Sequence, residues 1–424
     1  MIVPLQRKRR TQFPPPRGVA RCVTLRPALV GLVVLALAAC TSQPIASGLP
    51  QASGTTSPTA AGTETSPTPA GPALRLWGPR MTSATTGWAY DMSAYLIVRT
   101  IDGGHHWRRA TPPTEFAATG PPPVAFQDDL RAWLVGSPTG SDLLTSGPAP
   151  IYRTADGGRT WLQGGMIPVV STLSEIDVLD DQHAWVAALG DCTGSLCSDE
   201  PITISQTLDG GAHWSVVMDR QLDRATAGAL PLSCLKSGPA FVTASTGWVT
   251  AECHSGAPFF YVTRDGGTTW SLQGLPAPSG VTASRFRNCY CDLYPPAFQS
   301  GHDGLFVAIV FSDAAGTTST SAVYFTSDGG ASWTPRPSPT SYVVSPSFIS
   351  ATDGWVADLT AIYATHDGAR NWTQVSKVPV TGGTIQFVDL DHGFASGLDQ
   401  KESFLFATDD GGRSWAKVEP QATS

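Results

Sequence analysis

One short phrase, Thr-x-Asp-Gly-Gly-x-x-Trp, recurs seven times along this 424-residue chain. Such a repeat constrains the fold more than any local propensity, because each copy forms the same unit and no unit can bury its apolar face alone. The copies occupy 100–107, 154–161, 207–214, 263–270, 326–333, 365–372 and 408–415. Their aspartates are Asp102, Asp156, Asp209, Asp265, Asp328, Asp367 and Asp410. Their tryptophans are Trp107, Trp161, Trp214, Trp270, Trp333, Trp372 and Trp415.

The repeated aspartates are best interpreted as caps on tight turns. Asp-Gly is a strong hairpin signal, because glycine accepts a positive φ and the aspartate side chain accepts hydrogen bonds from turn amides. A catalytic site needs one or two special carboxylates, whereas this chain has seven equivalent ones. In the sixth copy Ala369 replaces the second glycine, which predicts the most strained of the seven turns.

A second phrase precedes every copy, and it consists of a small residue followed by a large apolar one. The large residues are Trp88, Trp133, Trp185, Trp248, Leu305, Trp355 and Phe394. Another large apolar residue, the anchor, stands seven positions before each of them, at Met81, Phe126, Val178, Phe241, Phe298, Phe348 and Phe387. Each unit divides into four short strands, A to D, with the Asp-Gly-Gly turn between C and D. Seven units predict an all-β fold, a seven-bladed β-propeller of four-stranded antiparallel blades over 73–420, with a tail at 421–424.

The repeated phrase resembles the Asp-box, or bacterial neuraminidase repeat, of sialidases, sortilin-type receptors and xyloglucanases. Combined with the preceding Gly-Trp phrase, it most resembles the photosystem II stability and assembly factors, which are seven-bladed propellers. That resemblance implies a non-catalytic protein that binds a macromolecular partner during the assembly of a membrane complex. A cell-surface receptor for a polysaccharide or a peptide is an alternative.

The first 39 residues are expected to be a cleaved export signal. Seven Lys and Arg and no acid come before a twelve-residue apolar run, ALVGLVVLALAA, which is too short to span a bilayer. The run leads into Leu37-Ala38-Ala39-Cys40, which resembles a bacterial lipoprotein processing site and implies lipidation of Cys40. An ordinary signal peptide cut near Ala39 is the alternative. Residues 40–72, rich in Ser, Thr and Pro, are expected to form a disordered tether, so the predicted location is extracytoplasmic and membrane-anchored.

Charge and motifs exclude several classes of function. Without residues 1–39 the chain has 20 basic and 34 acidic residues, a net charge of −14, and no basic cluster that would predict nucleic-acid binding. We expect neither a metal nor a cofactor, because no phosphate-cradling loop, nucleophile elbow or His-Glu metal motif is present. The Phe/Tyr-Arg-Ile-Pro motif of sialidases is also absent. We therefore expect no enzyme, with an exo-glycosidase of sialidase type as the alternative.

Spacing distinguishes the two faces of the expected propeller. The spacing from anchor to strand-B residue is always seven positions, and from box Asp to box Trp it is always five. The spacings from strand-B residue to box Trp, and from box Trp to the next anchor, vary between 15 and 29 positions. The A–B and C–D turns share one face, the Asp-box face, so every insertion falls on the opposite, insertion face, where ligand binding is expected. Blades 3 to 5 carry insertions at 191–201, 221–237, 254–258 and 275–297. The candidate binding residues there are Arg285, Arg287, Tyr290 and Tyr294.

Six cysteines map near the insertion face, at Cys192, Cys197, Cys234, Cys253, Cys289 and Cys291. An even number in an exported chain favours disulfides. We expect a Cys192–Cys197 bond and cross-links among the other four with the pairing open, and a four-cysteine zinc site is the alternative. The predicted ligand of this face is a protein or a polysaccharide, and the chain is expected to be a monomer.

Overall fold

The computed structural model describes residues 74–112, 121–137, 147–171, 174–191, 193, 199–221, 227–312, 318–398 and 402–423. Cys40, Cys192 and Cys197, with the predicted signal and tether, lie outside these residues. The described part consists of short strands and one short helix, α1 (Ala283–Phe286). None of its helices is long and apolar enough to cross a membrane.

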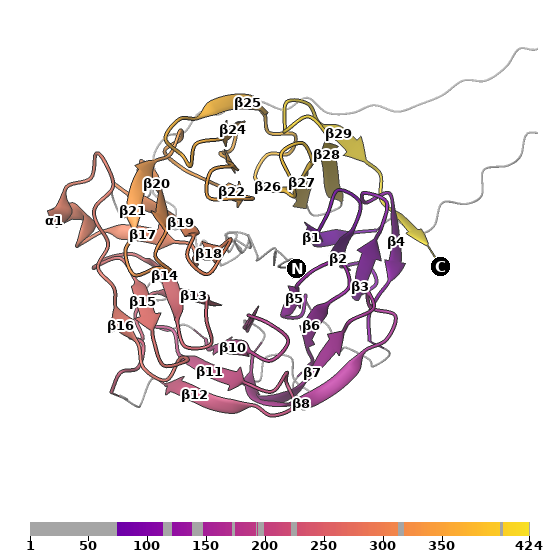
Figure 1. Ribbon diagram of the computed structural model, residues 1–424, viewed down its shortest axis with the longest axis horizontal. Coiled ribbons are helices and arrows are strands. Elements are labelled where there is room, and N and C mark those ends of the chain that lie inside the picture. Colours follow the sequence, from indigo (N-terminus) through magenta and orange to yellow (C-terminus); the bar gives the residue numbers. More distant parts are fainter. Residues whose placement is uncertain are drawn as a thin grey trace, which may run out of the picture. The chain divides into compact units, whose positions relative to one another are not determined.

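Seven four-stranded units follow one another around the ring in Figure 1. Blade 1 contains β1 (Leu76–Met81), β2 (Gly87–Asp91), β3 (Leu96–Thr100) and β4 (His106–Arg109). Blade 2 contains β5 (Val124–Phe126), β6 (Ala132–Val135), β7 (Gly147–Thr154) and β8 (Leu162–Val170). Blade 3 contains β9 (Glu175–Val178), β10 (Ala184–Leu189), β11 (Ile202–Thr207) and β12 (Ser215–Arg220). Blade 4 contains β13 (Leu235–Phe241), β14 (Gly247–Cys253), β15 (Phe260–Thr263) and β16 (Ser271–Leu272).

The remaining blades repeat this order. Blade 5 contains β18 (Ala297–Phe298), β19 (Gly304–Phe311), β20 (Ser319–Thr326) and β21 (Thr334–Pro337). Blade 6 contains β22 (Ser345–Phe348), β23 (Gly354–Ala357), β24 (Ala361–Thr365) and β25 (Thr373–Lys377). Blade 7 contains β26 (Thr384–Phe387), β27 (Gly393–Leu398), β28 (Ser403–Thr408) and β29 (Ala416–Val418). In every blade the anchor ends strand A and the box threonine ends strand C, which confirms the predicted seven-bladed, all-β fold.

Two strands were not predicted from the repeat. β17 (Tyr290–Leu293) lies between β14 and β19 and joins blades 4 and 5 into one continuous sheet. β30 (Gln421–Thr423) pairs in parallel with β4, so the end of the chain extends the sheet of blade 1. The predicted tail at 421–424 thus contains a strand at Gln421–Thr423.

Neighbouring blades are joined by the strand-B ring of one blade and the anchor of the next. In four joints these two rings stack: Trp88 on Phe126 at 5.3 Å, Trp185 on Phe241 at 3.6 Å, Trp248 on Phe298 at 5.2 Å, and Trp355 on Phe387 at 3.8 Å. In the other three joints the same two positions share one apolar cluster. Stacked aromatic pairs contribute about 0.5–1.5 kcal/mol each beyond their buried area. The constant spacing of seven residues thus keeps each blade in register with its neighbour.

The Asp-box of blade 2 shows how the carboxylate closes its turn. Asp156 Oδ1 accepts hydrogen bonds from the Thr154 hydroxyl (2.9 Å) and from the backbone N–H groups of Arg159 (3.0 Å) and Thr160 (2.9 Å). The Thr160 hydroxyl donates to Asp156 Oδ2 at 2.6 Å. The threonine bond and both bonds from the residue four positions after the aspartate recur in all seven boxes. The box aspartates are therefore turn caps.

A backbone hydrogen bond fastens each box to the A–B turn of its own blade. The N–H of the first box glycine donates to an A–B turn carbonyl, for example from Gly157 to Leu130 at 2.9 Å and from Gly411 to Asp391 at 2.9 Å. The same bond is present in all seven blades. Ala369, at the second glycine position of the sixth box, has a φ of 64°. The left-handed conformation costs an L-residue about 1–2 kcal/mol, which agrees with the strain predicted for this turn.

We expect Asp156→Ala to lower the free energy of unfolding by about 1–3 kcal/mol, because several turn donors lose their acceptor. The matched control is Asp191→Ala, which removes an exposed carboxylate outside any box. Chemical denaturation at pH 7 measures both variants. Equal stability of the two would contradict a capping role.

The same pair of variants tests the pKa of the cap. Hydrogen bonds from the Thr160 hydroxyl and backbone N–H hold the pKa of Asp156 at about 2, below its ordinary value of 3.8. A carboxyl whose pKa is depressed by folding stabilises the fold above pH 3.8, and this contribution disappears as the pH falls through about 2. We expect the stability difference between the unsubstituted chain and Asp156→Ala to shrink between pH 5 and pH 2. A difference that is independent of pH over this range would refute the assignment.

Candidate functional site

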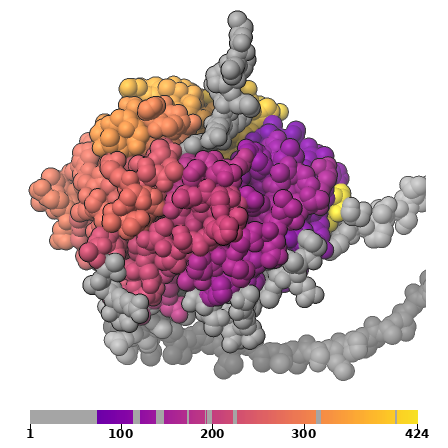
Figure 2. Space-filling model, turned by 60° about the horizontal axis from the view of Figure 1, so that its bottom comes forward, coloured from indigo at the N-terminus to yellow at the C-terminus, as the bar shows by residue number. Residues whose placement is uncertain are grey.

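The main elaboration of the insertion face is the junction of blades 4 and 5. β17 pairs with β14 through Glu252–Asp292 and Cys253–Cys291, and with β19 through Tyr290–Phe311. We call this surface the β17 platform and define it as residues 252–254, 283–293, 311 and 342. Figures 1 and 2 show that α1 projects from the outer rim of the ring beside β17.

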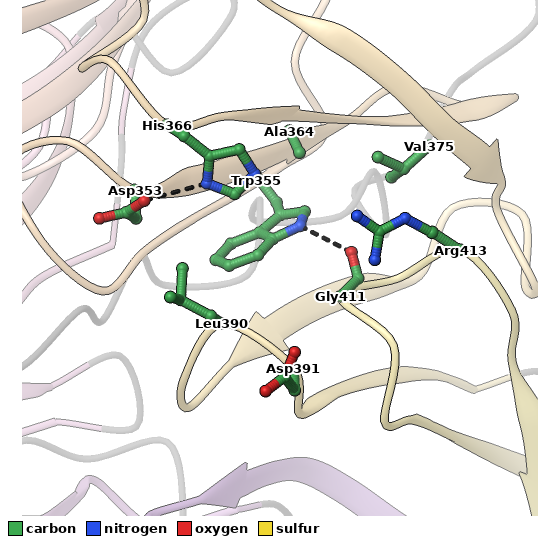
Figure 3. Close-up of a pocket in the computed structure, with 9 residues that line it drawn as sticks. All are labelled: Asp353, Trp355, Ala364, His366, Val375, Leu390, Asp391, Gly411 and Arg413. Carbon is green, nitrogen blue, oxygen red and sulfur yellow. Dashed lines mark hydrogen bonds and ion pairs between the residues drawn. The ribbon is translucent and has the colours of Figure 1, made fainter.

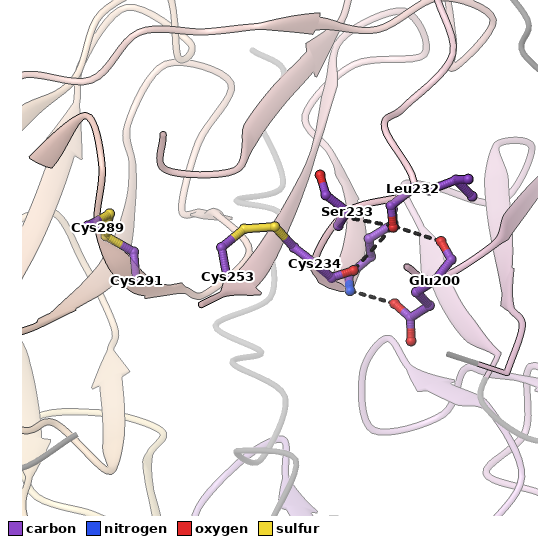
Figure 4. The surroundings of a disulfide bond; sticks show 8 residues. Glu200, Leu232, Ser233, Cys234, Cys253, Cys289 and Cys291 are labelled. Carbon is purple, nitrogen blue, oxygen red and sulfur yellow. Dashed lines mark hydrogen bonds between the residues drawn. A yellow bond between two sulfur atoms is a disulfide. The ribbon is translucent and has the colours of Figure 1, made fainter. Parts of the chain in front are cut away.

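Two disulfides brace the β17 platform (Figure 4). Cys234 pairs with Cys253, with a Cα–Cα distance of 4.7 Å, and Cys289 pairs with Cys291, at 5.4 Å. The first bond ties the segment before β13 to the end of β14, and the second lies at the start of β17. These four cysteines are thus cross-linked among themselves, and the alternative of a four-cysteine zinc site is set aside because their sulfurs are oxidised in pairs.

A buried lysine holds the segment that carries Cys234. Lys236 is fully buried, and its Nζ donates to the carbonyls of Glu200 (2.7 Å), Leu232 (2.7 Å), Ser233 (3.2 Å) and Cys234 (3.3 Å). In return, the Glu200 carboxylate accepts the Lys236 backbone N–H at 2.6 Å. Hydrogen bonds to a charged group are stronger than neutral ones. Figure 4 shows these groups beside the Cys234–Cys253 bond. The lysine thus holds the segment to which the platform residue Cys253 is cross-linked.

A row of four aromatic rings crosses the β17 platform. The ring centroids of His254 and Tyr290 are 4.7 Å apart, those of Tyr290 and Phe311 are 4.5 Å apart, and those of Phe311 and Tyr342 are 6.1 Å apart. The first three rings are half-buried and Tyr342 is 39% exposed. The row therefore offers a continuous aromatic edge to solvent, from the end of β14 to the segment between β21 and β22.

Carboxylates lie beside this row. The Tyr290 hydroxyl donates to Glu252 Oε1 at 3.1 Å, and Asp292 is paired with Glu252 across the sheet. Burial raises the pKa of the Tyr290 hydroxyl well above its usual value, and the charge of Glu252 raises it further. Burial, followed by Asp292 and Glu252, also raises the pKa of Tyr342. The tyrosines of the row therefore remain protonated hydrogen-bond donors at neutral pH.

The structure separates the four residues proposed for binding. Arg287 is exposed at the C-terminal end of α1, Arg285 is half-buried within it, and Tyr290 stands in the aromatic row. Tyr294 was wrongly placed on the surface: it is 6% exposed and belongs to the core cluster of Leu305 and Phe348. Its N–H donates to Val307 at 3.0 Å, so the chain continues along β19 and turns this ring inward.

Sequence reasoning missed His254, Phe311 and Tyr342. His254 and Phe311 contact Tyr290 because β17 pairs between two blades, and Tyr342 joins the row through Phe311. The repeat contains no signal for the pairing of β17. The run of apolar residues that ends in Phe311 does indicate a long strand-B extension. Such an extension could have pointed to an added strand alongside it.

A separate pocket of about 360 Å³ opens between blades 6 and 7 on the Asp-box face (Figure 3). Its lining residues are Asp353, Trp355, Ala364, His366, Val375, Leu390, Asp391, Gly411 and Arg413. His366 Nδ1 lies 3.0 Å from Asp353 Oδ1, and the Trp355 indole N–H donates to the Gly411 carbonyl at 3.0 Å. The variation in loop length along the sequence did not predict this pocket, because its lining residues belong mainly to A–B turns and Asp-boxes, which have constant length.

Comparisons with known proteins found a repeat-family match and several similar solved structures. The family model "BNR/Asp-box repeat" matches residues 261–272, which contain the whole fourth box. Similar solved structures include "YCF48 bound to D1 peptide", with 21% identity, a TM-score of 0.45, and coverage of 80% of this chain and 95% of that one. YCF48 from Cyanidioschyzon merolae has 17% identity and a TM-score of 0.43, and coverage is 84% and 98%.

A GH74 xyloglucanase from Xanthomonas campestris is also similar, with 13% identity, a TM-score of 0.36, and coverage of 82% of this chain and 68% of the enzyme. A search of curated proteins gave no match. With seven boxes of the same hydrogen-bonded geometry on seven four-stranded units, the chain is a β-propeller of the BNR/Asp-box type.

Proposed function

We propose that this chain is a non-catalytic binding propeller that captures a macromolecular partner on the β17 platform. The observation that carries the proposal is β17 itself, a strand added to the blades, braced by two disulfides and bearing an aromatic row at the surface. A loop held in one shape loses less conformational entropy when a partner binds. Tyrosine and arginine combine large contact area with polar specificity, which suits the centre of an interface.

The preferred partner is a protein segment. The platform combines the exposed Arg287 with the carboxylates of Glu252 and Asp292 and with tyrosine hydroxyls, so it matches a surface of mixed charge. The net charge of −14 after removal of residues 1–39 disfavours a polyanion. A neutral polysaccharide that stacks on the aromatic row is the second candidate partner.

One observation favours a glycosidase as the alternative function. The Tyr290 hydroxyl bonds to Glu252 and a second carboxylate, Asp292, lies across the strand pair, which is the combination of groups expected of a sialidase-type enzyme. Burial and the adjacent carboxylate raise the pKa of Tyr290, and this makes its hydroxyl a poor nucleophile. Hydrolysis of a fluorogenic sialoside that is lost in Tyr290→Phe would overturn the binding function in favour of this one.

We further propose that the propeller works outside the cytoplasm, attached to a membrane through lipid on Cys40. The support is the sequence Leu37-Ala38-Ala39-Cys40 after an apolar run, and the disulfides of the β17 platform, which form and persist in oxidising compartments. The Ser/Thr/Pro-rich residues 40–72 would then separate the propeller from the lipid surface.

The platform is tested by Arg287→Ala combined with Tyr342→Ala, two substitutions of exposed side chains that spare the Tyr290–Glu252 bond. We expect capture of the partner from solubilised native membranes to weaken by about tenfold or more, which corresponds to ~1.4 kcal/mol. The matched control is Leu208→Ala with Arg370→Ala, an exposed apolar and an exposed basic residue on the Asp-box face. Both double variants should melt like the unsubstituted chain. Loss of capture in the control variant alone would show that the partner binds the Asp-box face and would contradict binding at the β17 platform.

Anchoring is tested by Cys40→Ser. We expect this variant to stay unprocessed or to leave the lipid phase, because the substitution removes the acceptor of the lipid. Detergent partitioning, metabolic labelling with a fatty acid and mass spectrometry of the N-terminus measure the effect. A native N-terminus at a residue other than Cys40 would disprove the proposal.

A further inference from the structure

On the Asp-box face, the residue before the box threonine stands at the groove between its blade and the next blade. In blades 1 to 3 the residue before the box threonine is long and polar: Arg99, Arg153 or Gln206. Arg99 donates from Nε to the carbonyl of Asp129, in the A–B turn of blade 2, at 2.9 Å. Arg153 and Gln206 approach the first box glycine of the next blade so closely that an added Cβ there would lie 2.7 Å and 3.2 Å from their side chains. Each of these side chains therefore fills the groove ahead of its own blade.

Blade 6 has Ala364 at this position, and the 360 Å³ pocket opens there. Blades 4 and 5 carry the buried apolar residues Val262 and Phe325 at the same position. Blade 7 also has an alanine, Ala407, but that residue packs against the apolar cluster that joins blades 7 and 1. The pocket between blades 6 and 7 is thus a groove from which the filling side chain is missing. Its volume is at the lower end of the ~300–1,000 Å³ typical of ligand sites.

The filled grooves show which chemical group the pocket suits. The guanidinium of Arg99 lies 5.5 Å from the ring centroid of Trp88, and that of Arg153 lies 5.0 Å from Trp133. Both rings are the strand-B tryptophans of their blades, and the equivalent residue in blade 6 is Trp355, which lines the pocket. A cation near an indole ring is stabilised by the ring quadrupole. Trp355 is fully buried, so its ring lies beneath the exposed lining residues His366, Leu390, Asp391 and Arg413.

The polar groups of the filled groove also have counterparts in the pocket. The carbonyl that accepts Arg99 belongs to the residue four positions before the strand-B residue of blade 2, and in blade 7 this residue is Leu390, which lines the pocket. Two carboxylates, Asp353 and Asp391, supply negative charge. In Figure 3 Asp391 lies on the opposite side of Trp355 from the Asp353–His366 pair. A cation in the pocket would thus be close to carboxylates that line it.

Arg413 also lines the pocket and would place a positive charge near a bound guanidinium. The groove filled by Arg99 contains an equivalent pair of like charges. Arg413 occupies the position in box 7 that Arg159 occupies in box 2. Arg159 is close enough to lower the pKa of Arg99, after burial and Arg108, yet Arg99 remains in its groove. Arg413 itself is engaged by its own turn, because its Nη1 donates to the Asp410 carbonyl. A nearby arginine therefore does not prevent a guanidinium from occupying a groove of this propeller.

We propose that the pocket between blades 6 and 7 binds the arginine side chain of a peptide ligand, in the place that Arg99 and Arg153 fill from within in blades 1 and 2. The site is independent of the β17 platform, which lies on the opposite face. The acidic balance of the chain beyond residue 39 adds long-range attraction for a basic segment. The proposed occupant is an arginine within a peptide, because the counterparts of its contacts recognise only the guanidinium and require neither a free α-amino group nor a free α-carboxylate.

The experiment is calorimetric titration of the full purified chain with N-acetyl-L-arginine amide. Its controls are the citrulline analogue, a neutral isostere of the same shape, and free L-arginine. We expect saturable binding of the arginine amide and none of the citrulline analogue. Ala364→Arg should abolish binding with the fold retained, since it supplies from within the side chain present in blades 1 and 2.

A second pair of variants keeps the test independent of the folding of Ala364→Arg. Asp391→Asn should weaken binding by about threefold or more through the loss of one charge at the surface. The matched control, Asp409→Asn, removes an exposed carboxylate of the same blade that does not line the pocket, and it should bind as the unsubstituted chain does. The proposal is overturned if the arginine amide does not bind or binds no better than its citrulline analogue. It is also overturned if only free L-arginine binds, or if Asp391→Asn and Asp409→Asn are indistinguishable.

Discussion

The contact between a strand-B ring and the anchor of the next blade is the interaction on which the rest of this propeller depends. It requires the A–B turn to have constant length, because this turn connects the anchor of a blade, which contacts the preceding blade, to its strand-B residue, which contacts the following blade. The first box glycine then bonds to the same turn, so the C–D turn is fixed as well. One face of the ring is thereby fully specified by packing and backbone hydrogen bonds. Insertions can be accommodated only on the other face, where no joint between blades constrains them.

This dependence explains which parts of the fold were predictable from the sequence. The anchors, the strand-B residues and the box threonines each occupy the same structural position seven times, so a regular spacing was enough to place them. β17 and β30 have no counterpart in other blades. β30 pairs with β4, at the other end of the propeller sequence, and β17 pairs with strands of two different blades. A single short strand such as Tyr290–Leu293 has no periodicity that distinguishes it from a loop. Nonlocal pairing, rather than weak propensity, limited the prediction.

The candidate site was predictable to a smaller extent for the same reason. The cysteines and the inserted segment directed attention to the junction of blades 4 and 5, where Arg287 and Tyr290 do lie at the surface. The burial of Tyr294 follows from its hydrogen bond along β19, which is a consequence of β17. His254, Phe311 and Tyr342 join Tyr290 only through that strand. A composition argument could select aromatic residues in a loop, but only the strand pairing decides which of them share a surface.

Departures from the repeat occur in two opposite forms, and each form has its own physical meaning. At β17 the chain adds a strand, two disulfides and a buried lysine network, and none of these groups belongs to the contact between strand-B residue and anchor that recurs in every joint. At Ala364 the chain omits a side chain that blades 1 to 3 use to fill a groove. An unfilled groove forfeits packing that its neighbours retain. Because the other blades show which guanidinium contacts are lost there, the repeat itself defines the chemistry of a ligand that would restore them.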